Sequence, residues 1–283
     1  QRPRVNHTVK MSVPMQVGDV RIAEDADFQK VKDMCQCHDD WKQEYNKNGI
    51  TVWTKSNDVS DFKLVKVRGI LKDVSAATMY DVLHDPVYRK IWDFNMLEGF
   101  EMCCLNPNND ISYYALRAPK PFKNRDFVTQ RSWLDLGKEF MIINHSVNHV
   151  ALPPKKSFVR GISYLTGYLI VTNGDRPTDP GCTLSYVTQS DPKGKLPSWA
   201  VNKMTHWFAP KVMKTLYKAA KAYDSWKAKH NPNLKPWLYP EQMDMPRVNL
   251  SDIKSIQECV NSEVIDETKC REDELNQEDS DGV

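Results

Sequence analysis

The chain has 283 residues, of which 40% are hydrophobic and 27% are charged, and its formal net charge is +2. This is an ordinary globular composition, with enough apolar mass for one large core or two smaller ones. No apolar run approaches the ~18 residues that a membrane-spanning helix needs, so we do not expect an integral membrane protein.

The charge is distributed unevenly along the chain. Residues 243–283 hold four basic and twelve acidic side chains, a net −8, which leaves +10 for residues 1–242. A basic body favours anionic partners such as a membrane surface or nucleic acid, and an acidic tail can compete with them. Because this tail has few large apolar residues, we predict that residues 243–283 are disordered.

The seven cysteines show no regular spacing, which favours reduced thiols in a cytosolic protein over a secreted disulfide scaffold. Cys35, Cys37 and His38 are followed by no second Cys or His pair at zinc-finger spacing, so we predict no metal site. The sequence also lacks a GxGxxG motif, a P-loop and an HExxH motif. We therefore expect a binding protein without a cofactor rather than an enzyme.

The first half of the chain begins with a predicted flexible arm, residues 1–23, which mixes polar residues, Pro and Gly without periodicity. Helical spacing of apolar residues predicts a helix over 24–37, and Asn48-Gly49 predicts a hairpin turn. A strand over 62–72 and a second helix follow, which begins after the capping residue Ser75 and ends at Pro86.

The second half is rich in strand patterns and ends in a long helix over 197–230. Successive strands favour an antiparallel meander, so we predict an α+β domain over 24–231 in which the last helix packs on a curved sheet. Residues 232–242 are predicted to be a Pro-rich extension. The predicted strands are 96–105, 110–118, 126–136, 139–147, 158–173 and 182–190.

Several of these strands carry an apolar face that also contains hydroxyl groups. Residues of the same parity in a strand share a face, and an unpaired polar atom in a solid core is unfavourable. Such faces are explained either by an internal cavity that holds a part-polar ligand or by exposure at the surface, and parity does not decide between them. The faces consist of residues 112, 114, 116 and 118, residues 127, 129, 131 and 133, and residues 162, 164, 166, 168 and 170.

The long helix carries many lysines and one acidic residue, Asp224. Together with Trp207 and Phe208, this pattern predicts docking on an anionic membrane, and a solvated amphipathic helix explains it equally well. Since the helix lacks Arg, the usual reader of base edges, nucleic acid is not expected as a partner. The lysines proposed to dock are Lys211, Lys214 and Lys218, beside Trp207.

The segment YRKIWD, residues 88–93, combines a cation, an acid and a bulky aromatic ring. Arg89 and Asp93 are four residues apart, so in a short helix they share a face and pair. This arrangement suits recognition of a phosphate on an otherwise apolar ligand, although a solvated salt bridge beside a core Trp has the same pattern.

Four segments then resemble one known family in order along the chain: DVLHDPVYRKIWD, YYALRAPKPFKNRDFVTQRSW, FVRGISYLTGYL and DPKGKLPSWAVNK. The chain resembles the StAR-related lipid-transfer (START) family over roughly residues 24–240, and within it the phosphatidylcholine-transfer subgroup. The resemblance implies a helix-grip fold, in which a curved antiparallel sheet and a long C-terminal helix enclose a tunnel for one lipid.

The resemblance also implies roles for individual residues. Arg89 takes the place of the family's phosphate-binding Arg and Asp93 that of its acidic neighbour. Tyr114, Phe127 and Tyr164 fall at the three aromatic positions that cage choline. The dedicated phosphatidylcholine carrier has Trp in place of Tyr114 and Tyr in place of Phe127, which makes phosphatidylethanolamine a second expected cargo. The residues expected to line the tunnel are Leu116, Thr166, Met204 and Phe208.

The expected function is exchange of one glycerophospholipid between membranes by a cytoplasmic monomer that contacts them peripherally. The loop over 117–124 is expected to move when cargo enters. The alternative is a lipid or sterol sensor that signals its ligand state to a protein partner through residues 232–283. Ser280 lies between acidic residues, a context suited to an acid-directed protein kinase, and its phosphorylation would add negative charge to the tail.

Overall fold

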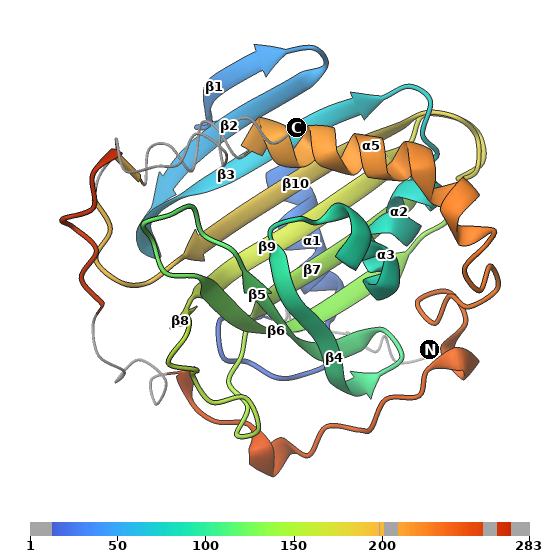
Figure 1. The fold of residues 1–283 in the computed structure, drawn as a ribbon. Helices are drawn as coiled ribbons and strands as arrows, with labels where there is room; N and C mark the ends of the chain where they lie inside the picture. The colour runs from blue at the N-terminus through green and yellow to red at the C-terminus, as the bar shows by residue number, and fades with distance from the viewer. Residues whose placement is uncertain (1–12, 198, 201–208, 257–264, 273–283) are drawn as a thin grey trace, which may run out of the picture.

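The computed structural model describes residues 13–197, 199–200, 209–256 and 265–272. Within these ranges one ten-stranded sheet has the order β1-β2-β3-β10-β9-β7-β6-β5-β4, and the short strand β8 pairs with β6 in parallel (Figure 1). All other strand pairs are antiparallel. The strands are β1 (Lys42–Lys47), β2 (Ile50–Asn57), β3 (Ser60–Leu71), β4 (Met96–Asn106), β5 (Asn109–Leu116), β6 (Arg125–Asp135), β7 (Glu139–Ser146), β8 (Val159–Arg160), β9 (Ile162–Thr172) and β10 (Cys182–Asp191).

The helices cover both faces of the sheet (Figure 1). On one face, Val31 of α1 (Asp25–Gln36) belongs to a buried cluster with Leu169 of β9. On the other face, Met213 of α5 (Ala209–Lys227) is buried in a cluster with Ile170, the next residue along β9. Successive strand residues point to opposite faces, so the two cores lie on either side of one sheet. Two short helices, α2 (Ala76–His84) and α3 (Pro86–Trp92), lie on the α5 side. No helix in the described ranges is long and apolar enough to span a membrane.

The predicted α+β fold, a curved antiparallel sheet with a long C-terminal helix packed on it, is confirmed. The predicted hairpin turn has positive φ at both Asn48 (54°) and Gly49 (74°), as a tight two-residue turn requires. The strand predicted over 158–173 is divided at Gly161. A Cβ at that position would lie 2.4 Å from the ring of Phe127, so only glycine allows this close approach.

The position of α3 depends on the Asp85 carboxylate, which lies in a buried residue. Its Oδ1 accepts hydrogen bonds from the backbone amides of Val87 and Tyr88, both at 3.0 Å, and so caps α3. Its Oδ2 accepts hydrogen bonds from two α5 side chains, Lys227 Nζ at 2.8 Å and Tyr223 OH at 3.1 Å. One carboxylate therefore starts α3 and ties it to α5.

The N-terminal arm, predicted to be flexible over 1–23, makes specific contacts in its described part, residues 13–23. Met15 is buried, and Arg21 pairs with the buried Asp27 of α1 at 2.9 Å. The amide of Gly18 also donates to the carbonyl of Ser146 at 2.9 Å. A few specific contacts hold a segment that has no apolar periodicity. Residues 1–12 lie outside the described residues.

The predicted Pro-rich extension, 232–242, and the predicted disordered tail, 243–283, make specific contacts in their described residues. Trp237 is only 9% exposed, and its indole N–H donates to Asp81 of α2 at 2.7 Å. Farther on, the amide of Val248 donates to the carbonyl of Cys104 on the edge strand β4, at 2.9 Å. Figure 1 shows this segment running around the edge of the sheet beside β4. It is ordered because it pairs with groups that the sheet edge leaves free.

Residues 265–272 contact two loops at the end of the sheet. The Glu267 carboxylate, in a residue only 6% exposed, pairs with Arg125 Nη2 at 2.6 Å and accepts a hydrogen bond from the amide of Lys123 at 2.7 Å. Its backbone amide donates to the carbonyl of Lys195 at 2.9 Å. The predictions for residues 257–264 and 273–283 lie outside the described residues.

Replacing Glu267 by Ala should release this contact. Arg125 would lose its buried partner, and breaking a buried ion pair from one side costs about 3–5 kcal/mol of unfolding free energy. Chemical denaturation measures the loss, and amide hydrogen exchange at Glu267 and Lys195 shows whether the segment detaches. Lys269→Ala, an exposed position in the same segment, is the control. Unchanged exchange and stability in Glu267→Ala would show that the segment is held by other contacts.

Candidate functional site

Arg89 and Asp93 form the predicted ion pair at the C-terminal end of α3. Arg89 Nε lies 3.2 Å from Asp93 Oδ2, and the side chains are 36% and 15% exposed. Asp93 ends the helix, since its amide makes the last helical hydrogen bond, to the carbonyl of Arg89. One edge of the guanidinium is thus bound by Asp93, and its remaining N–H groups can donate to a ligand.

Two stacked aromatic rings lie beside Arg89. Tyr114 of β5 is paired in register with Phe127 of β6, and their rings stack with centroids 5.0 Å apart. The Arg89 guanidinium carbon lies 6.0 Å from the Tyr114 ring and 6.0 Å from the Trp92 ring. The structure therefore brings together Arg89, Asp93, Tyr114 and Phe127, four of the five predicted headgroup residues.

Two further tyrosines join this group, and neither was among the predicted site residues. Tyr168 of β9 is paired with Tyr186 of β10, and their ring centroids are 4.8 Å apart. Burial raises the pKa of the Tyr114, Tyr168 and Tyr186 hydroxyls, and the nearby Arg89 charge partly opposes that rise. At neutral pH these hydroxyls stay protonated, so they remain hydrogen-bond donors. The signal for Tyr168 was its parity, which matches that of Thr166 on the same strand face.

The other predicted residues are placed less centrally. Tyr164, the fifth headgroup residue, is half-buried at a bulge of β9 between Ser163 and Leu165. Leu116 is half-buried at the end of β5, and Thr166 is buried with its hydroxyl 2.9 Å from that of Thr188. The remaining predicted residues, Met204, Trp207, Phe208 and Ser280, lie outside the described residues.

The lysines of α5 differ in exposure and in pairing. Lys214 and Lys218 are exposed and Lys211 is half-buried. Lys227 is only 7% exposed and pairs with Asp85, so its charge is used inside the protein. Lys221 pairs with Asp73 at 2.9 Å. The sequence pattern overstated the number of cations available for a membrane, because it does not show which lysines find partners.

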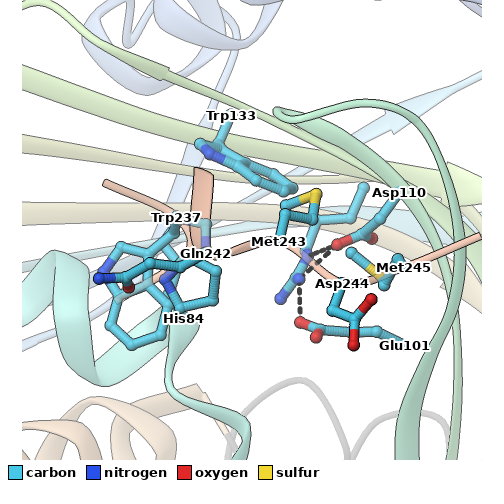
Figure 2. Close-up of a pocket in the computed structure, with 11 residues that line it drawn as sticks. His84, Glu101, Asp110, Trp133, Trp237, Gln242, Met243, Asp244 and Met245 are labelled. Carbon is cyan, nitrogen blue, oxygen red and sulfur yellow. Dashed lines mark hydrogen bonds and ion pairs between the residues drawn. The ribbon is translucent and has the colours of Figure 1, made fainter. Parts of the chain in front are cut away.

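A separate pocket of about 220 Å³ lies between the sheet and the C-terminal segment (Figure 2). Its volume is below the ~300–1,000 Å³ typical of ligand sites, which makes it unsuitable for a phospholipid. Arg131 lies in it between two carboxylates, with its Nη2 bound to Asp110 and Glu101. The lining residues are His84, Glu101, Asp110, Arg131, Trp133, Pro236, Trp237, Gln242, Met243, Asp244 and Met245.

The polar groups of this pocket are only partly satisfied by the described residues, since Asp110 Oδ1 and His84 Nε2 have no hydrogen-bond partner among them. His84 is 3% exposed, and burial lowers its pKa well below its usual range, so it is neutral. Burial also raises the pKa of the Asp110 carboxyl to about 6, although Arg131 opposes the rise. The described residues contain no group of three or more His, Cys, Asp or Glu side chains placed to hold a metal ion.

Comparison with known proteins identifies the family. Residues 21–225 match the START domain. The chain is 44% identical to mouse START domain-containing protein 10 over 89% of its length and 86% of that protein. It is 28% identical to mouse phosphatidylcholine transfer protein over 65% of its length and 85% of that protein. The chain therefore belongs to the START domain family, and its predicted similarity to the phosphatidylcholine-transfer subgroup is confirmed.

Solved structures agree with this assignment. The crystal structure of human STARD10 superimposes with a TM-score of 0.78, at 43% identity over 83% of this chain and 95% of that one. Human StAR-related lipid transfer protein 5, at 22% identity, has a TM-score of 0.61 over 69% of this chain and 93% of that one. The second likeness shows the shared fold alone.

The raised pKa of Asp110 predicts a pH dependence of stability. Its folded pKa of about 6 exceeds the ordinary value of ~3.9, so between these values the native state holds more protons than the unfolded state. This group therefore lowers stability as the pH rises from about 4 to about 6. Asp110→Asn removes the titration, so the stability advantage of the native chain over the variant should grow as the pH falls across this range. Urea denaturation at several pH values measures it. An advantage that shrinks instead would mean that Arg131 lowers the Asp110 pKa.

Proposed function

We propose that this protein binds one glycerophospholipid, phosphatidylcholine and also phosphatidylethanolamine, and exchanges it between membranes. The observation that carries the proposal is the Arg89 guanidinium, 36% exposed and 6.0 Å from the ring of Tyr114, which stacks on Phe127. The protein would act as a cytoplasmic monomer in peripheral contact with membranes, without catalysing a reaction.

The chemistry of the site fits a zwitterionic headgroup. The guanidinium of Arg89 presents several donors in one plane, which suits phosphate better than the single charge of a lysine. The protonated hydroxyls of Tyr168 and Tyr186 supply further donors. An ammonium group is attracted to aromatic faces, with ~0.5–2 kcal/mol for each contact, and Tyr114 and Phe127 offer such faces. Phosphate and ammonium are thus recognised by adjacent but different groups.

Transfer also requires an apolar enclosure for the acyl chains. Each methylene exposed to water costs ~0.8 kcal/mol, so a phospholipid does not diffuse freely between membranes. Tyr168 packs against a buried cluster that includes Met213 and Leu216 of α5, so apolar side chains lie beside the tyrosines of the site. The name of the related phosphatidylcholine transfer protein supports the same class of cargo.

A sensor that signals its ligand state to a protein partner is the second candidate. One observation favours it: Glu267 accepts a hydrogen bond from the amide of Lys123, in the loop over 117–124 that we expect to move with cargo. A movement of that loop would reach the C-terminal segment directly. In a sensor, transfer between vesicles would be slow and partner binding would change with ligand. Phosphorylation of Ser280 by an acid-directed kinase is proposed for either function.

Replacing Arg89 by Leu should abolish phospholipid binding and leave the fold intact, because the side chain is partly exposed and its partner Asp93 can be hydrated. A charge-assisted hydrogen bond contributes roughly 1.5–3 kcal/mol, so transfer between vesicles should fall at least tenfold. Native mass spectrometry with lipid identification measures the cargo.

The matched control is Arg176→Leu, which removes an arginine that pairs with Asp179 three residues away on the surface. A native protein that carries no lipid, or only sterol, would contradict the proposed function. An Arg89→Leu variant that keeps its phospholipid would contradict the role of Arg89.

Tyr114→Trp should shift the cargo toward phosphatidylcholine. Trp gives the strongest cation–π attraction, and a quaternary ammonium relies on aromatic faces more than an ammonium that donates hydrogen bonds. The ratio of phosphatidylcholine to phosphatidylethanolamine extracted from mixed vesicles should rise several-fold. The control is Tyr45→Trp, which changes a tyrosine on strand β1. An unchanged ratio would mean that Tyr114 does not contact the ammonium group.

A further inference from the structure

Large apolar side chains are exposed along α3 and the start of β4. Val87 is 59% exposed, Ile91 49%, Phe94 75% and Leu97 41%. Val87 and Ile91 are four residues apart and so lie on one side of α3, whereas Tyr88 on the same helix is buried against α5. We call these four side chains the α3–β4 apolar face.

This exposure is unusual within the protein. Phe94 is the most exposed large apolar side chain among the described residues. Single exposed apolar residues need no explanation, but several gathered in one short stretch mark an interaction surface. β4 is also the last strand of the sheet, and Figure 1 shows α3 leading directly into it.

The α3–β4 apolar face and the headgroup site share one short helix and the turn that follows it. Arg89 and Asp93, the two charged groups of that site, alternate along the chain with Ile91 and Phe94. Val87 and Ile91 are each two residues from Arg89, so they lie on another side of α3. Phe94 directly follows Asp93, and the Arg89 side chain remains 36% exposed. The headgroup site and the apolar face therefore both reach the molecular surface at the end of α3.

The charges around the face are mainly positive. Lys90, Arg117 and Lys120 are exposed, and the amide of Arg117 donates to the carbonyl of Asn95 at 2.7 Å, which places the start of its loop beside Phe94. Glu98, an exposed carboxylate of β4, is paired with Lys155 at 2.9 Å. An apolar centre with a cationic border matches the interface of a membrane that contains anionic lipid.

We propose that the α3–β4 apolar face enters the interfacial layer of an anionic bilayer and presents the Arg89 site to it. The inference rests on the proposed function, since a carrier must receive its cargo from a membrane. A bilayer is favoured over a protein partner because the cargo itself lies in the bilayer and because cations border the apolar side chains. This contact is separate from the lysines on α5.

The test is vesicle binding by an Ile91→Ser/Phe94→Ser variant, with vesicles of phosphatidylcholine and phosphatidylserine. The partition coefficient from sedimentation should fall roughly tenfold or more, because two apolar side chains no longer enter the acyl boundary. Lys90→Glu/Arg117→Glu should weaken binding to anionic vesicles and leave the weak binding to neutral vesicles unchanged. The matched control is Val59→Ser/Leu136→Ser. These two residues lie in connections between strands, outside α3 and β4, and their side chains are 59% and 57% exposed.

Native mass spectrometry of the same samples separates this proposal from the proposed function. Retained phospholipid in the Ile91→Ser/Phe94→Ser variant, together with lost vesicle binding, shows a folded carrier that no longer docks, and supports the proposal. Native-level vesicle binding and transfer by that variant would overturn the docking face and leave the proposed function intact. An equal loss of vesicle binding in the Val59→Ser/Leu136→Ser control would also overturn the docking face. Absence of phospholipid from the native protein would overturn the proposed function instead.

Discussion

The buried Asp85 carboxylate is the contact on which the headgroup site depends. It starts α3 by accepting two backbone amides and binds Lys227 and Tyr223 of α5 with its other oxygen. Four donors satisfy the carboxylate, which is the condition under which a charge is tolerated in a protein interior. Arg89 lies one turn after the cap, so its place over the Tyr114 ring follows from where this carboxylate holds the helix.

Buried ion pairs also fix β6, the strand that carries Phe127. Arg125 and Arg131 both lie on β6, one paired with Glu267 and the other with Asp110. Phe127 lies between them on the same strand and stacks on Tyr114. The aromatic pair is therefore held on a strand that is fixed at two points by charges. Desolvation offsets much of the attraction within such pairs, so they add little net stability, whereas removal of one partner alone is costly.

Local sequence rules predicted the parts of the fold that depend on neighbouring residues. Asp85-Pro86 marked the end of one helix, Asn48-Gly49 marked a turn, and the spacing of Arg89 and Asp93 predicted their pairing. The division of the strand at Gly161 was missed because its cause is the Phe127 ring, far away in sequence. Tyr168 was placed on a candidate strand face but not in the site, and Tyr186 was missed, because strand order, not spacing, brings them to Arg89.

The contacts of the C-terminal segments were not predicted, for a different reason. Composition measures average apolar content, and residues 243–272 are poor in it. In the described residues 243–256 and 265–272, order instead depends on single contacts such as Glu267 with Arg125 and Val248 with Cys104. A segment that follows an existing surface needs only a few such contacts, because the surface is already formed.

The contact between Val248 and Cys104 has a consequence for how the domain can be divided. The match to the START domain ends at residue 225, whereas the segment that covers the edge of β4 begins about twenty residues later. A chain shortened to the family boundary would lose the two backbone hydrogen bonds at Cys104, and it would also lose Lys227, the partner of Asp85. Unpaired strand edges bind other strands, so the uncovered part of β4 would become open to pairing with a second chain. The sequence beyond the family boundary thus covers part of the sheet edge and completes the buried ion pair at the start of α3.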